Sequence, residues 1–225
     1  MIEQKFLDYI SLCKAIDYHF YEELFDYYVK SLNLKTVNKL KFDTSNKTYY
    51  EPSKKTININ LNELYEYALF NNYSVLCRYK QILYINSELL AYLFHELIHA
   101  KQQNIIKKNE IANELIVDAL KKSFRRAYFY NKLYEEFHDY FVIEYNANVE
   151  SQLMLKEFLD KLDLEYNPYR LQLYLENGYN NICPQERESN LLNKKYKIKN
   201  LNQLSEFEKI IYGFPIEKEK IIIKK

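Results

Sequence analysis

The chain has 225 residues, of which 48% are hydrophobic and 28% charged, so it is long enough for one folded domain with a substantial core. Its net charge of +1 offers no basic surface of the kind that neutralises phosphates, and no nucleic-acid partner is expected. No apolar run approaches the ~18 residues of a membrane span, and no signal-peptide pattern opens the sequence. We therefore expect a cytoplasmic protein with no membrane partner.

The N-terminal third changes its hydrophobic period once. Two glycines and four prolines in the whole chain favour helices joined by short loops. Residues 3–32 carry apolar side chains at helical spacing, which predicts one long helix or two shorter ones. Between residues 40 and 61 the pattern alternates, as where Ile57 and Ile59 flank Asn58, and this predicts two short strands. Asn62 is then expected to cap a short helix.

The rest of the chain is predicted to be helical. Asn86 or Ser87 is expected to cap a buried central helix over residues 88–102, and further helices follow at about 111–137 and 142–162. Two shorter helices are predicted over residues 170–176 and 202–212. Together, these predicted helices and strands indicate an α+β, mainly α-helical fold with a small antiparallel sheet. We expect a single domain over residues 1–225: an N-terminal helical segment (1–38), a core (39–165) and a C-terminal helical extension (166–225).

The cysteines predict a reducing compartment. The three cysteines are odd in number, widely spaced and form no Cys-x-x-Cys pair, which is typical of reduced thiols in a reducing compartment. We expect Cys13, Cys77 and Cys183 to be reduced and mostly buried thiols.

The central helix contains the motif that carries chemistry, H-E-x-x-H at His95, Glu96 and His99. On a helix, residues four apart lie on one face, so both imidazoles can reach one metal ion. Glu96 lies about 100° round the helix from His95, where its carboxylate can act on a metal-bound water. Zn²⁺ is the expected metal, because two histidines and a carboxylate with an open position form its usual catalytic site.

The third metal ligand is expected from a later helix, and several residues could supply it. Glu144 stands at the start of the predicted helix over 142–162, and Glu114 stands one helical turn before Asp118. His138 is another candidate, and Glu150 is a more distant one. The residues alone leave these alternatives open.

A family resemblance favours one of them. The segment from Phe94 to Gln102, followed by Glu144-Tyr145-Asn146-Ala147-Asn148, resembles the gluzincin-type metallopeptidases of the ImmA/IrrE kind. The resemblance implies a zincin-like core and Glu144 as the third zinc ligand. It also implies a zinc peptidase that hydrolyses a restricted protein substrate. No glycine follows at the spacing H-E-x-x-H-x-x-G-x-x-H, which excludes a metzincin.

The expected mechanism uses a water molecule activated by the metal, with Glu96 as the general base. His138, Tyr130, Tyr134 or Tyr140 could donate a hydrogen bond to the oxyanion, and residues 56–60 could form the sheet edge that receives a peptide substrate. The alternative is a catalytically idle, metal-stabilised binding or regulatory module of a phage or mobile element.

Overall fold

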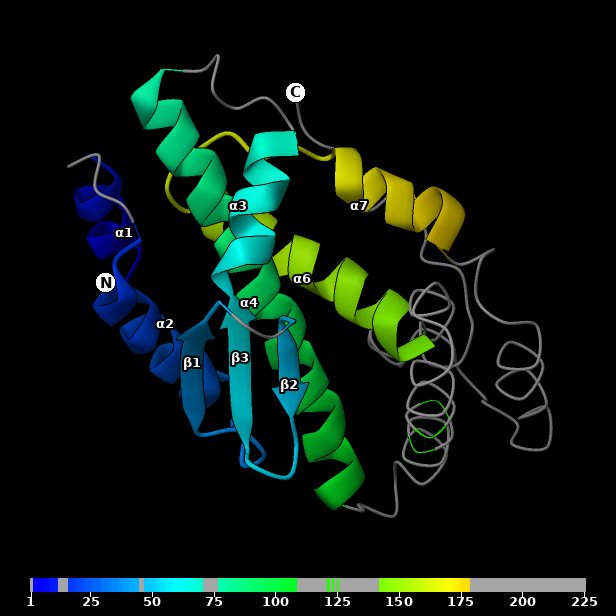
Figure 1. Cartoon of the computed structure of the whole chain (residues 1–225). Coiled ribbons are helices and arrows are strands. Elements are labelled where there is room, and N and C mark those ends of the chain that lie inside the picture. The colour runs from blue at the N-terminus through cyan, green and yellow to red at the C-terminus, as the bar shows by residue number, and fades with distance from the viewer. Residues whose placement is uncertain are drawn as a thin grey trace. The chain divides into compact units, whose positions relative to one another are not determined.

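The computed structural model describes residues 2–11, 16–44, 47–70, 77–108, 121, 123, 125 and 142–178 (Figure 1). Its chain divides into two compact units, residues 1–104 with 151–166 and residues 105–150 with 167–225. The described residues are mainly helical, with one small sheet, and this agrees with the predicted α+β class. The predicted single domain stays a prediction.

Two helices open the first unit, α1 (Ile2–Ser11) and α2 (Tyr18–Ser31). The carboxylate of Asp17 caps α2 by accepting a hydrogen bond from the main-chain N–H of Phe20. At the other end, Asn33 adopts a positive φ of 50°, and Leu34 N–H donates to the carbonyl of Val29. This left-handed Asn closes the helix as glycine usually does. The sequence pattern over residues 3–32 thus encodes two helices.

Three short strands form the sheet: β1 (Lys39–Asp43), β2 (Tyr49–Glu51) and β3 (Thr56–Asn60). The order is β1-β3-β2, with β1 parallel and β2 antiparallel to β3. The link from β1 to β2 therefore passes the end of β3, where Asn60 N–H donates to Thr48 Oγ1. The sheet is mixed, so the predicted antiparallel sheet holds for the β2–β3 pair and is wrong for the β1–β3 pair, because the chain crosses the end of β3 between β1 and β2. It has three strands where two were predicted.

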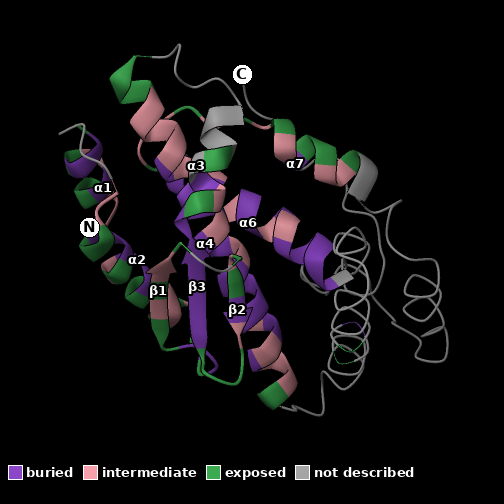
Figure 2. Cartoon of the chain, in the orientation of Figure 1, coloured by how far each residue is buried: buried purple, intermediate pink, exposed green. Residues whose placement is uncertain are grey.

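Strand β3 lies at the centre of the sheet and is buried along its whole length (Figure 2). Ile57 and Ile59 enter the hydrophobic core from one face. Thr56, Asn58 and Asn60 alternate with them on the opposite face and are buried as well, while β1 and β2 pair with the two main-chain edges of β3. The prediction that residues 56–60 form a free edge is therefore wrong, since both of their hydrogen-bonding sides are taken.

Two helices follow the sheet directly, α3 (Leu61–Phe70) and α4 (Arg78–Lys108). Asn60 caps α3 through its side-chain oxygen, which accepts from Asn62 N–H, so the cap lies two residues before the predicted one. Helix α4 begins nearly three turns before its predicted start. Asn86 and Ser87 lie inside it, and their side chains donate to the carbonyls of the preceding turn instead of capping.

Helix α4 is the centre of the first unit's core. Its residues Leu89, Leu90, Leu93, Phe94 and Leu97 belong to one hydrophobic core cluster with aromatic side chains of α1 and α2 and with Ile57 and Ile59 of the sheet. The rings of Phe94 and Tyr28 lie edge to face, with centroids 4.9 Å apart. The predicted buried central helix is confirmed.

Helix α6 (Val142–Asp160) agrees with the predicted helix over 142–162. Its C-terminal half adds Leu155, Phe158 and Leu159 to the same core. A short helix α7 (Tyr169–Leu173) and a π-helical turn η4 (Tyr174–Gly178) cover the predicted helix over 170–176. None of the described helices is both long and apolar enough to cross a membrane.

The predictions for the cysteines and for two of the helices have different outcomes. Cys77 is exposed, so its prediction as a buried thiol is wrong, because it precedes α4 instead of lying within a packed helix. The other two cysteines and the helices predicted at 111–137 and 202–212 lie outside the described residues, apart from residues 121, 123 and 125.

Candidate metal centre

Helix α4 places both motif histidines on one face. His95 and His99 are one turn apart, and Nε2 of His99 lies 3.0 Å from Nε2 of His95. Two nitrogen ligands of a tetrahedral zinc ion, each about 2.0–2.1 Å from the metal, are separated by about 3.3 Å. The two imidazoles therefore present the same ring nitrogen to one point in space, at nearly the spacing that a shared ion requires.

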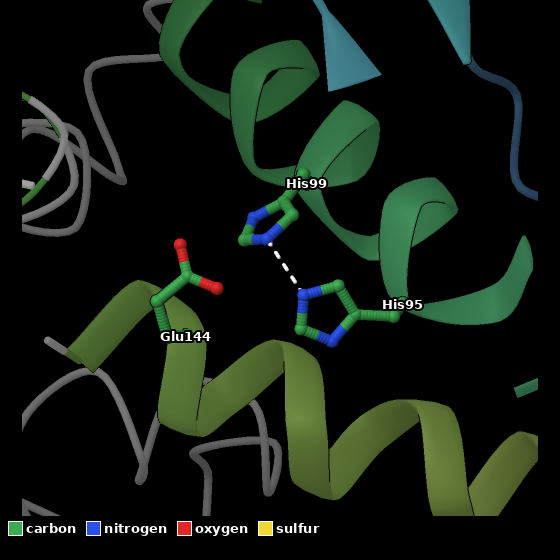
Figure 3. A group of neighbouring side chains, drawn as sticks. All are labelled: His95, His99 and Glu144. Carbon is green, nitrogen blue, oxygen red and sulfur yellow. Dashed lines mark hydrogen bonds between the residues drawn. The ribbon is translucent and has the colours of Figure 1, made fainter. Parts of the chain in front are cut away.

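Glu144 completes a group of three possible ligands. One side-chain donor atom from each of His95, His99 and Glu144 lies within 4.8 Å of the other two. Figure 3 shows the Glu144 carboxylate, from the first turn of α6, directed towards the two rings on α4. Two imidazoles and one carboxylate form a donor set compatible with a metal site.

The surroundings of the three ligands are largely dry. His99 is 7% exposed, Glu144 4% and Glu96 6%, while His95 is half-buried. A buried carboxylate is costly unless a cation or hydrogen-bond donors compensate its charge. Because Glu144 and Glu96 are shielded from water, their negative charges attract a divalent cation more strongly than exposed carboxylates would.

Gln102 is a further member of the site that the sequence prediction missed. It is fully buried on α4, and its Oε1 lies 2.9 Å from Nδ1 of His99. Histidine ligands of metals commonly donate their second ring N–H to an acceptor of this kind. The signal was present in the sequence: Gln102 is seven residues after His95 and three after His99, so it shares their face of the helix.

Of the predicted site residues, the structure brings together His95, His99 and Glu144, and it places Glu96 on the same turn of α4. Glu150, the distant alternative ligand, lies nearly two turns after Glu144 on α6 and is not one of the grouped residues. Glu114 and His138, together with the tyrosines named as oxyanion donors, lie outside the described residues.

No protein-family model, curated protein or solved structure matches this chain significantly.

Proposed function

We propose that this protein is a zinc-dependent peptidase with a zincin-like core, in which His95, His99 and Glu144 hold the metal and Glu96 is the general base. The convergence of the three donor atoms within 4.8 Å carries the proposal, because residues 45 positions apart in sequence supply one compact donor set. The geometry of the two imidazoles fits Zn²⁺, as does the mixed nitrogen and oxygen donor set.

Bound zinc would supply a Lewis acid that polarises the scissile carbonyl and lowers the pKa of a coordinated water. The protein's own residues do the rest. Glu96 accepts the proton of the attacking water and passes it to the leaving amine, so one carboxylate acts first as base and then as acid. Its burial keeps competing bulk water away during this transfer.

The preference for peptides is inferred from the motif and from the resemblance to gluzincin-type enzymes, which also suggests a restricted protein substrate. A short sheet beside an H-E-x-x-H helix supports the same proposal, because extended peptides bind to such sheets by adding a strand. Of the two outer strands, β1 exposes Lys39 and Lys41, side chains that discourage edge pairing, whereas β2 carries no lysine. Strand β2 is therefore the better candidate for the receiving edge.

The test is a zinc determination combined with cleavage of a broad peptide library. Wild-type protein should contain one zinc per chain and cleave a subset of peptides. The Glu96→Gln variant should keep its zinc and lose about 10²- to 10⁴-fold in rate, because only the proton acceptor has changed. Glu88→Gln, the same change two turns earlier on α4, should leave the rate unaltered.

Two results would contradict the peptidase. An unchanged cleavage rate in Glu96→Gln would remove the general base from the mechanism. One zinc per chain with no cleavage of any peptide would favour the alternative, a metal-stabilised binding or regulatory module.

A further inference from the structure

We propose that Gln102 is a positioning residue, which holds His99 in the tautomer that presents a bare Nε2 to the metal. The inference rests on the proposed metal site and assigns a fifth residue to it. Its chemistry is that of an outer hydrogen-bond partner, which touches neither metal nor substrate.

The geometry of the contact defines the role. Gln102 Oε1 lies 2.9 Å from Nδ1 of His99, a normal hydrogen-bond length, and Nε2 of the same ring faces His95 (Figure 3). The carbonyl oxygen of an amide can only accept a hydrogen bond, so Nδ1 must carry the proton. In a neutral imidazole the other nitrogen is then unprotonated, and this nitrogen is the one directed at the centre of the donor group.

Burial makes Gln102 hard to replace by solvent. Its side chain is 0% exposed and His99 is 7% exposed, so bulk water has little access to Nδ1. Loss of the glutamine acceptor would remove the hydrogen bond that Nδ1 donates, and a shift of the proton to Nε2 would block metal binding.

Both imidazole ligands and Gln102 come from one helix. His95, His99 and Gln102 occupy positions i, i+4 and i+7 of the continuous helix α4, which lie on one face. The two imidazole ligands and the residue that orients one of them are therefore fixed by the same helical backbone. The functional motif on this helix is longer than H-E-x-x-H and extends to H-E-x-x-H-x-x-Q.

Zinc affinity tests the role directly, measured on the full chain by competition with a chromophoric chelator. Gln102→Leu removes the acceptor at similar volume and should weaken zinc binding about 10- to 100-fold, the usual effect of losing such a partner. Gln102→Glu restores an acceptor, and its charge should return the affinity to the wild-type value or above. Gln103→Leu, the same change one residue further on, is the matched control and should bind zinc normally.

A second measurement reports the protonation of the His99 ring. In ¹⁵N-edited NMR spectra of the zinc-loaded protein, the His99 Nδ1–H proton should be protected from exchange in wild type and in Gln102→Glu. It should broaden or vanish in Gln102→Leu, while a merely structural role would leave it unchanged. If Gln102→Leu fails to fold, Gln102→Met removes the same acceptor and serves in its place.

The outcomes separate this inference from the proposed function. Wild-type protein that binds zinc but cleaves no peptide contradicts the peptidase, and the affinity series still supports the positioning role. A zinc affinity of Gln102→Leu within about twofold of wild type overturns the role of Gln102, whatever the activity. Wild-type protein that binds no zinc overturns both.

Discussion

The hydroxyl of Thr36 donates a hydrogen bond of 2.6 Å to the main-chain carbonyl of Ala100, the residue directly after the second motif histidine. The main-chain carbonyl of Thr36 in turn accepts from the hydroxyl of Tyr50 on β2. One turn further along α4, Asn104 accepts from Lys35 N–H and donates to the carbonyl of Asn33. Residues 33–36 are thus fastened to the turns of α4 that carry His99 and Gln102, and they fix this part of the helix against the sheet.

Replacing Thr36 with Val tests this attachment. The change keeps the shape of the side chain but leaves a polar carbonyl facing a methyl group, so we expect a loss of about 1–2 kcal/mol in the free energy of unfolding. Urea titration followed by circular dichroism measures it. Thr44→Val, at an exposed threonine just after β1, is the control and should stay within about 0.5 kcal/mol of wild type. Equal losses in both variants would mean that the Thr36 hydrogen bond contributes nothing specific.

Glu144 is the ligand on which the metal proposal depends most. Gln is isosteric with Glu but uncharged, so Glu144→Gln should weaken zinc binding at least as much as the loss of an outer hydrogen-bond partner does, which is about 10- to 100-fold. Wild-type protein should keep about one zinc per chain, and the variant should keep less. Inductively coupled plasma mass spectrometry after dialysis measures the metal. Glu157→Gln, an exposed glutamate on the same helix, supplies the control. Full zinc retention in Glu144→Gln would assign the third ligand to another residue.

Buried tyrosines predict loss of stability at alkaline pH. Burial raises the pKa of Tyr21 well above its usual 10.0, and the neighbouring Tyr9 hydroxyl adds to the rise. Burial likewise raises the pKa of Tyr9 and of Tyr28. Below about pH 10 these groups are neutral in both the folded and the unfolded chain. Above it the unfolded chain ionises first, so the free energy of unfolding should fall as pH rises.

Tyr21→Phe should make that alkaline fall shallower, because one ionisable group is removed from the buried set. At neutral pH the same variant should lose about 1–3 kcal/mol, since the Tyr21 hydroxyl donates to the buried side chain of Asn86 at 2.8 Å. Urea unfolding at about pH 8 and about pH 11 gives both effects. Tyr169→Phe, at a tyrosine that is 65% exposed, is the control. A slope with pH that is identical in Tyr21→Phe and wild type would exclude Tyr21 as a contributor.

The sequence predicted the chemistry of α4 better than its boundaries. The i, i+4 spacing of His95 and His99 required only a helix, and a helix formed, so the two rings share a face. The start of α4 was misplaced because Asn and Ser commonly cap helices, yet Asn86 is held inside this one by its hydrogen bond from Tyr21. A contact over 65 residues is invisible to a local propensity argument.

The sheet shows the same limit. The alternation of Ile57 and Ile59 correctly indicated a strand, but β3 is buried on both faces and both edges, and a sequence period reports only the faces. Whether a strand lies at the centre of a sheet depends on which segments pair with it. The prediction of two strands between residues 40 and 61 missed one of the three, because strands of three to five residues leave only a weak alternating pattern. Glu144 was favoured as a ligand by family resemblance, whereas the residues alone left Glu114, His138 and Glu150 open as alternatives.

Two asparagines on β3 give a final test with opposite signs. The Nδ2 group of Asn58 is buried and has no hydrogen-bond partner among the described residues, whereas Asn60 Oδ1 caps α3 at 2.9 Å from Asn62 N. Asn58→Val replaces an uncompensated polar group with a good strand former and should raise the free energy of unfolding by about 1 kcal/mol. Asn60→Val removes the cap and should lower it by about 1 kcal/mol. The two variants carry the same substitution two residues apart on one strand, so each controls for the other in a urea titration. A loss of stability in both would mean that Asn58 is compensated by a partner such as ordered water, since only a satisfied polar group at that position makes its removal costly.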